Sequence, residues 1–227
     1  MKLLTCLAFL LWMMPAGAQD AAALVQKVKA RLDQVNDYQA EGRMKIDVSF
    51  IDASPSKVTI YYKKPDKFKV KKEGGISLLP KGGISINLGT LLAGDQYDIV
   101  PSKDATVNGV AVKVVKLLPS NDNGDVVLTT LYIEEKKLVI RKATVTTKES
   151  GTYDIVLTYG RYASWGLPDQ VVFSFNTKDY KLPKGITFEY EKGGEKKEDP
   201  NKNKRGTVTI DYSSYTINKG VSDKVFQ

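Results

Sequence analysis

The chain of 227 residues is 42% hydrophobic and 26% charged, which is typical of a folded globular protein and not of a fibrous or disordered one. It contains no histidine, which excludes a histidine general base, Ser-His and Cys-His nucleophiles and histidine ligands for a metal. Its one cysteine, Cys6, cannot by itself form a cysteine site for zinc, copper or iron. The 34 basic and 26 acidic residues give a net charge of +8.

The first residues have the pattern of a secretory signal peptide. Lys2 supplies the positive charge, Leu3 to Met14 form a short apolar run, and Ala16-Gly17-Ala18 follows as a small-residue cleavage site. Cleavage after Ala18 leaves 227 − 18 = 209 residues. No later segment approaches the ~18 to 20 apolar residues that a membrane-spanning helix needs. We therefore expect residues 1–18 to be a signal peptide and residues 19–227 to be a single exported domain.

An amphipathic helix is predicted directly after this leader. Its apolar residues recur at spacings of four, four and three, with charged residues between them. They are Leu24, Val28, Leu32 and Val35. Asp20 precedes the pattern and is expected to be the N-cap. The apolar stripe must pack on the strands that follow.

The rest of the chain is dominated by strand patterns. From Tyr38 to Phe50 apolar and polar residues alternate strictly, which predicts a strand with one dry and one wet face. Similar patterns lie at residues 58–62, 68–70, 97–99, 110–114, 127–133, 138–146, 153–159, 171–175, 186–190 and 208–212. Ten or eleven short strands separated by turn signals predict a mainly β fold, an antiparallel sheet too wide to stay flat. We expect it to curl into a barrel or half-barrel that the helix covers or plugs.

Residues Gly74 to Gly94 interrupt the strand pattern. Glycine pairs at residues 74–75 and 82–83 provide flexible joints, yet the segment is unusually apolar for a loop. Two interpretations stay open. The segment is either a pair of short elements packed on the core or a mobile apolar flap at the mouth of a cavity.

Motifs for catalysis and metal binding carry little weight in this sequence. Ser54-Pro55-Ser56-Lys57 matches S-x-x-K, but it falls in a predicted turn and no partner motif follows. Asp122-Asn123-Gly124-Asp125 lacks the alternating ligand spacing of a calcium loop and is better explained as a hairpin turn. We therefore expect no metal, no cofactor and no enzymatic activity.

A basic cluster with aromatic neighbours has three interpretations. Export argues against nucleic acid as the partner, although the pattern superficially resembles such a surface. The cluster could attract anionic lipid headgroups or an acidic partner. It could also serve only for solubility and protection of an edge strand. Its members are Lys63, Lys64, Lys67, Lys69, Lys71 and Lys72, with Tyr61, Tyr62 and Phe68.

Several short motifs, in this order, carry a resemblance to a known family. Val28 to Ala40 matches an opening of the type LKxRLDKVxxFxA, and Ile60 to Phe68 is similar to LWVKRPNxF. Ala93 to Tyr97 is similar to a DG turn with an aromatic strand, with the two turn residues reversed. Leu131 to Thr146 is similar to paired strands late in a barrel, and Gly166 to Asp169 to an LP turn before its last strand. The chain thus resembles the periplasmic outer-membrane lipoprotein carrier and sorting proteins, the LolA-like superfamily.

This resemblance implies both a fold and a function. The expected fold is a curved, unclosed antiparallel β-barrel with an N-terminal helix and lid segments around an apolar cavity. The expected function is a monomeric periplasmic carrier, without catalysis, that shuttles the acyl chains of lipoproteins or related lipids toward the outer membrane. The implied partners are acylated cargo and transient membrane-associated donor and acceptor proteins, and not nucleic acid. The alternative is a periplasmic lipid-sensing regulatory protein on the same fold; a hydrolase is the third possibility.

Candidate site residues follow from the strand faces and from the resemblance. In the family's carriers an arginine before the motif proline helps to hold the lid shut, and Lys64 takes that position here. A lysine cannot make the forked contacts of a guanidinium, so this departure raises the question of lid gating. For the lipid cavity we predict Tyr38, Met44, Ile46, Val48, Phe50, Ile60, Tyr62, Phe68 and Val70. For the flap we predict Ile76, Leu78, Leu79, Ile84, Ile86, Leu88, Leu91 and Leu92.

Overall fold

The fold was obtained as a computed structural model of the chain. It describes residues 16–48, 54–73, 92, 97–120, 124–149, 151–176 and 205–226, with side chains from Gln19 onward. The described elements are one α-helix, two short 3-10 helices and ten strands. The predicted mainly β class is therefore confirmed.

All ten described strands belong to one antiparallel sheet. Its strand order is β3-β2-β1-β10-β9-β8-β7-β6-β5-β4. The strands are β1 (Asp37–Asp47), β2 (Ser56–Lys63), β3 (Lys67–Lys72), β4 (Tyr97–Val107), β5 (Val110–Pro119), β6 (Val126–Glu134), β7 (Val139–Thr147), β8 (Gly151–Thr158), β9 (Gln170–Asn176) and β10 (Arg205–Ile217). Because β1 pairs with β10, the first and last of the described strands lie side by side, third and fourth from the β3 edge of the sheet.

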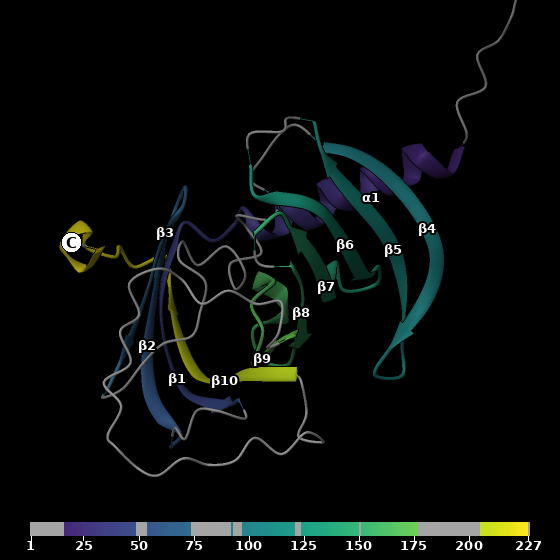
Figure 1. The fold of residues 1–227 in the computed structure, drawn as a ribbon. Helices are drawn as coiled ribbons and strands as arrows, with labels where there is room; N and C mark the ends of the chain where they lie inside the picture. The colour runs from purple at the N-terminus through teal and green to yellow at the C-terminus, as the bar shows by residue number, and fades with distance from the viewer. Residues whose placement is uncertain are drawn as a thin grey trace, which may run out of the picture.

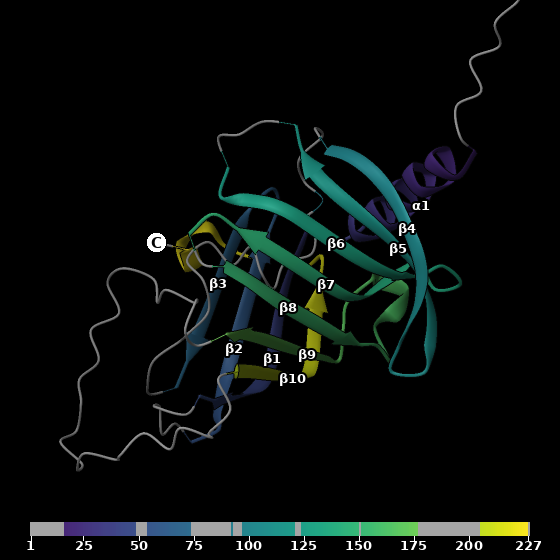
Figure 2. The same cartoon turned by 45° about the vertical axis from the view of Figure 1, so that its right-hand side comes forward.

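The sheet is strongly bent but not closed. Figure 1 shows β1 to β3 standing on one side and the teal strands β4 to β6 curving around the other, and Figure 2 shows β4 to β9 in succession across the bend. Among the described residues the two edge strands are β3 and β4, which do not pair with each other. These edges are consecutive in the sequence, so the chain between residues 73 and 97, which contains the predicted flap, links them.

Helix α1 (Ala16–Leu32) lies beside β4 on the concave side of the sheet (Figure 1). Leu24 and Val28 are buried in the core as predicted, and Val35 is buried just after the helix ends. The N-cap prediction is wrong, because the helix already begins at Ala16 and Asp20 lies inside it. The residues before and after Asp20 are mainly alanine, the strongest helix former, and extend the helix upstream.

The core lies on the concave face, and β1 shows how the sequence places it there. Residues 38, 40, 44, 46 and 48 are buried, whereas residues 39, 41, 43, 45 and 47 are exposed. The predicted dry and wet faces of this strand are therefore confirmed. Ile155, Leu157 and Phe173 from β8 and β9 belong to the same core.

Candidate functional site: the apolar inner face

The inner face of β1 to β3 is built from rows of apolar side chains on neighbouring strands. Tyr38 lies opposite Tyr62, and Tyr62 lies opposite Phe68. In the next row Ile60 lies between Ala40 and Val70. The β1 and β2 residues in both rows are buried, whereas Phe68 and Val70 on the edge strand are half-buried and pack against the core. The side chains at the edge thus remain the most accessible part of this surface.

Two further rows connect β1 to the other half of the sheet. Met44 lies opposite Ile210, and Ile46 lies opposite Val208, which in turn faces Phe173 of β9. All five side chains are buried, Met44 to 1% exposure. The predicted residues of β1 therefore belong to an apolar surface that continues across β10 into β9.

Most of the surface on β8 to β10 was not assigned to the site from the sequence. The Tyr153 ring lies 5.1 Å from the Phe173 ring, and Phe173 lies 5.4 Å from Phe175. Alternation identified these segments as strands, but only the pairing of β1 with β10 brings them beside Met44 and Ile46. Strand pairing over such a sequence distance has no signal in local periodicity.

A cluster of tyrosine rings closes one end of the inner face. Tyr38 lies 5.3 Å from Tyr62 and 5.4 Å from Tyr215, and Tyr215 stacks on Tyr212 at 5.0 Å. A register shift between Glu41 and Gly42 on β1 leaves one extra residue on β10 between Tyr212 and Ser214. Such a bulge resets the alternation of side chains, so Tyr212 and Tyr215 both contribute to the cluster although they are three residues apart.

The buried tyrosines are held in the neutral form. Burial raises the pKa of Tyr38 and of Tyr215, and the neighbouring tyrosines raise both further. The Tyr215 hydroxyl donates a hydrogen bond to the Pro168 carbonyl oxygen at 2.8 Å. The pKa of Tyr212 is likewise raised by burial. Uncharged rings provide a largely apolar wall.

Lys64 contacts the end of helix α1. Its ammonium donates a hydrogen bond to the main-chain oxygen of Asp33 and lies 3.5 Å from the Asp33 carboxylate. At the same helix end, the Arg31 guanidinium donates to the Ser164 carbonyl oxygen at 3.2 Å, next to the 3-10 helix η1 (Ala163–Trp165). Lys64 thus connects the β2–β3 turn to the end of α1 through its ammonium group. A role of this contact in lid gating stays a prediction.

A pocket of about 350 Å³ lies where the inner and outer faces meet at the ends of β8 and β9. Its walls combine aromatic and polar side chains, and none of the predicted cavity residues that the structure describes lines it. The lining residues are Thr152, Tyr153, Asp154, Ser174, Phe175, Asn176 and Arg205. The pocket therefore adds space beside the Tyr153 and Phe175 rings of the inner face.

A charged network stabilises the outer side of this pocket. Asp154 accepts a hydrogen bond from Thr144 at 2.6 Å and pairs with Lys142 at 3.1 Å and Arg205 at 2.6 Å. Burial by itself raises the pKa of Asp154, but these three partners outweigh it and hold the pKa below the ordinary value. The carboxylate is thus kept ionised and occupied by its neighbours.

Part of the predicted site lies outside the described residues. This applies to Phe50 of the cavity set and to the flap residues Ile76, Leu78, Leu79, Ile84, Ile86, Leu88 and Leu91. Leu92 is described, and it is buried in the core at 3% exposure.

Within the described ranges no group of three or more His, Cys, Asp or Glu side chains is arranged to hold a metal ion. No helix in the same ranges has the length and hydropathy to cross a bilayer.

The fold is similar to several solved structures. A domain assigned to outer-membrane lipoprotein sorting from Vibrio parahaemolyticus superposes with a TM-score of 0.59 at 12% identity, covering 92% of this chain and 97% of that one. A DUF1329 family protein from Desulfovibrio piger gives a TM-score of 0.59 at 11% identity, with 93% and 97% covered. A LolA superfamily protein from Nitrosomonas europaea gives 0.57 at 10% identity, with 91% and 97% covered.

Comparison by sequence adds nothing to these structural similarities, because no protein-family model and no curated protein matches the chain. The structural similarity itself covers nearly the whole chain. The LolA-like fold predicted from the short motifs is therefore confirmed.

Proposed function

We propose that this protein is a periplasmic carrier that binds the acyl chains of lipoproteins or related lipids on its apolar inner face and shuttles them toward the outer membrane. The observation that carries the proposal is an unclosed sheet whose concave face is apolar from β3 to β9. The segment that links the two edge strands is itself rich in leucine and isoleucine. An unclosed edge beside an apolar surface suits a cargo that enters between the two edge strands.

The energetics of transfer from water support binding without any reactive group. Burial of one methylene group is worth about 0.8 kcal/mol, so a chain of ten contributes on the order of 8 kcal/mol before the entropic costs of binding. The inner face offers aliphatic side chains such as Met44 and Ile46 and neutral tyrosines such as Tyr38 for this contact. The proposal therefore requires no catalysis.

The similarity to solved structures is consistent with this function. Two of the similar structures are described as an outer-membrane lipoprotein-sorting domain and a LolA superfamily protein. Export to the periplasm, which the leader predicts, would place the carrier between the two membranes. The proposed route toward the outer membrane comes from this combination of leader and fold.

The proposal is tested by binding of a fluorescent fatty acid to the purified protein. Because Met44 and Ile46 face inward and Lys45 faces outward, Met44→Asp and Ile46→Asp should abolish binding, whereas Lys45→Asp should leave it unchanged. Circular dichroism checks that each variant is folded. Phe68→Asn provides a milder variant, since Phe68 is half-buried on an edge strand, and it should weaken binding severalfold.

Equal binding by Ile46→Asp, Phe68→Asn and Lys45→Asp, all folded, would contradict the proposal. Failure of the unmodified protein to bind any acyl chain, after extraction of bound lipid, would contradict it as well.

A further inference from the structure

We propose that the outer face of β2 and β3 is a docking surface for an anionic membrane. The acyl-binding proposal concerns the opposite, inner face of the same strands, and the docking proposal deepens it by naming where the carrier meets the bilayer. The occupant is a layer of negatively charged lipid headgroups. The docking surface consists of Lys57, Lys63, Lys67, Lys69 and Lys71, with Tyr61 between them, and is called the lysine face below.

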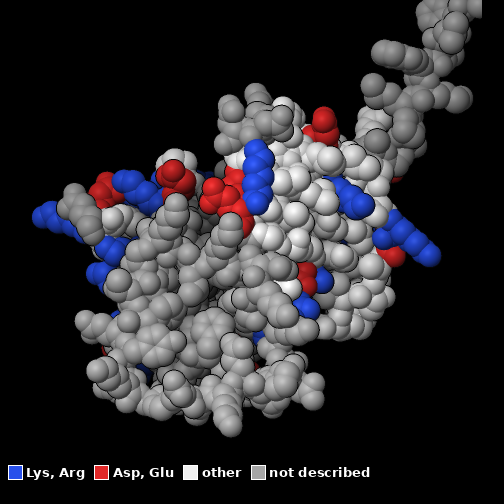
Figure 3. Space-filling view, in the orientation of Figure 1, with Lys and Arg blue, Asp and Glu red and all other residues white. Residues whose placement is uncertain are grey.

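Alternation along the two strands produces the lysine face. The inward positions of β3 carry Phe68 and Val70, so Lys67, Lys69 and Lys71 point to the opposite side. Outward positions on one strand are about 7 Å apart, so these three ammonium groups form a row about 14 Å long. Figure 3 shows basic side chains projecting from the margin where Figure 1 places β3 and the C-terminal turn, with acidic ones above them.

The register adds the lysines and the aromatic ring of β2 to this row. Lys63 lies opposite Lys67, and Tyr61 lies opposite Lys69. The Lys71 ammonium lies over the Tyr61 ring, 5.4 Å from its centre. The face therefore combines a grid of positive charges with an amphipathic ring, a side chain that favours the interface between membrane and water.

The charge balance of this segment is strongly positive. Residues 57–73 hold seven lysines and two acidic residues, 7 − 2 = +5. Glu41 on β1 lies beside the face, where it accepts a hydrogen bond from Thr59 at 3.1 Å, and Asp223 lies at one end of it. Counting both acids leaves 5 − 2 = +3. Within the described chain, neither Lys57 nor Lys71 forms an ion pair.

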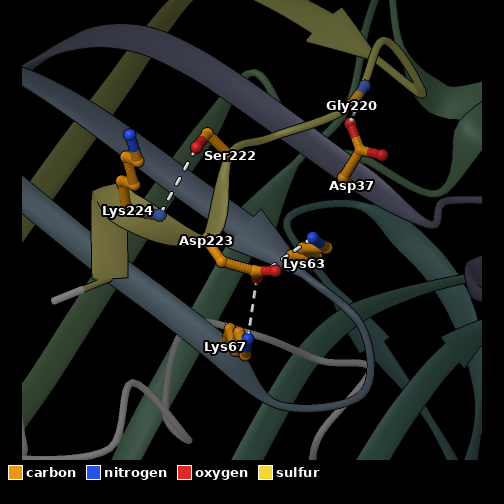
Figure 4. A network of polar contacts seen from close by, with 7 residues as sticks. All are labelled: Asp37, Lys63, Lys67, Gly220, Ser222, Asp223 and Lys224. Carbon is orange, nitrogen blue, oxygen red and sulfur yellow. Dashed lines mark hydrogen bonds and ion pairs between the residues drawn. The ribbon is translucent and has the colours of Figure 1, made fainter.

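Asp223 shows that one end of the face accepts an anionic group. Its carboxylate lies 3.0 Å from the Lys63 ammonium and 2.7 Å from that of Lys67, and it comes from the C-terminal 3-10 helix η2 (Asp223–Phe226) (Figure 4). Like charges on directly opposed residues destabilise a strand pair, and the carboxylate offsets this repulsion. Lys57 and Lys71 lie farther along the strands, and their charge remains available for an external anion.

The residue types favour a membrane over an acidic protein. The basic residues of the lysine face are all lysines, whose ammonium is a mobile point charge, whereas specific recognition of a carboxylate typically uses the forked guanidinium of arginine. A regular strand surface without a described pocket suits a diffuse layer of headgroups. The position also fits carriage of lipid, because β3 is an edge of the unclosed sheet. Docking through β2 and β3 brings that edge close to the bilayer.

The test is cosedimentation of the purified, leader-free protein with phosphatidylcholine vesicles that contain or lack phosphatidylglycerol. We expect binding only to the anionic vesicles and loss of binding at high ionic strength. The triple variant Lys57→Glu, Lys69→Glu, Lys71→Glu should weaken binding by about 100-fold or more. The matched control is the triple variant Lys103→Glu, Lys116→Glu, Lys136→Glu, whose residues are exposed on β4, β5 and the β6–β7 turn. It changes the net charge by the same amount and should bind the vesicles nearly as the unmodified protein does.

Several outcomes would overturn the docking surface. Equal losses in the two triple variants would mean that net charge alone drives binding. Absence of salt-dependent vesicle binding would exclude a membrane, and binding of polyglutamate in preference to anionic vesicles would indicate an acidic protein instead. Fatty-acid binding is measured on the same variants. If the lysine-face variant still binds fatty acid but not vesicles, docking and acyl binding are separate properties, and either proposal can fail alone.

Discussion

At the scale of single residues, the inner face depends on tyrosines that remain neutral. The pKa values of Tyr38, Tyr212 and Tyr215 are raised mainly by burial. Each hydroxyl is ionised more easily in the unfolded chain, where the pKa is about 10. The contribution of these neutral tyrosines to the free energy of unfolding is therefore complete below about pH 10 and is lost as the pH rises above that value.

This predicts a two-part alkaline titration. Absorbance at the phenolate wavelength should show that the exposed tyrosines ionise near their ordinary pKa. The buried tyrosines should ionise only when the protein unfolds, and circular dichroism monitors that unfolding. The free energy of unfolding, measured with urea, should fall steadily above about pH 10. If all 12 tyrosines ionised near pH 10 while the protein stayed folded, the buried cluster would be refuted.

At the scale of elements, Asn218 joins two segments that are distant in the sequence. Its side-chain oxygen accepts a hydrogen bond from the Asn36 amide at 2.7 Å, and its side-chain nitrogen donates to the Gln34 carbonyl oxygen at 2.9 Å. Its own amide donates to the Asp37 carbonyl oxygen at 2.9 Å. These bonds tie the C-terminal segment after β10 to the link between α1 and β1. Asn218 has a φ of +55°, a left-handed conformation that asparagine adopts more readily than most residues.

Asn218→Ala should lower the free energy of unfolding by about 2 kcal/mol, since it removes the three hydrogen bonds of the side chain and places alanine in a left-handed conformation. Asn218→Gly removes the same bonds without the conformational strain and should cost about half as much. The measurement is the midpoint of urea unfolding. An unchanged midpoint in both variants would show that the junction does not support the fold.

Sequence and structure agree best where local periodicity decides the outcome. The described strands were all expected, and the alternation in β1 placed Met44 and Ile46 inward and Lys45 outward. Features that depend on distant parts of the chain were missed. The pairing of β1 with β10, the extra residue near Ser213 and the docking of Asp223 on Lys63 have no periodic signature. The N-cap at Asp20 failed because an alanine-rich stretch before it also forms helix.

At the scale of the whole molecule, the two faces of one half of the sheet have different compositions. The inner side of β1 to β3 presents apolar rings and aliphatic side chains, and the outer side of β2 and β3 presents lysines. The same half contains an edge of the unclosed sheet, and the chain that leaves this edge runs to the other edge strand, β4. An apolar inner surface, an open sheet edge and a row of lysines thus belong to neighbouring strands, which is the arrangement that the proposed carrier requires.

The most direct test of lipid carriage is native mass spectrometry of the protein purified after export from a Gram-negative host. The account predicts a leader-free chain of 227 − 18 = 209 residues in complex with acyl-bearing molecules. Denaturation should release them as identifiable lipids or lipopeptides, and the folded Ile46→Asp variant should carry none. A folded protein with only the mass of its polypeptide, unable to take up acyl chains from added vesicles, would contradict it.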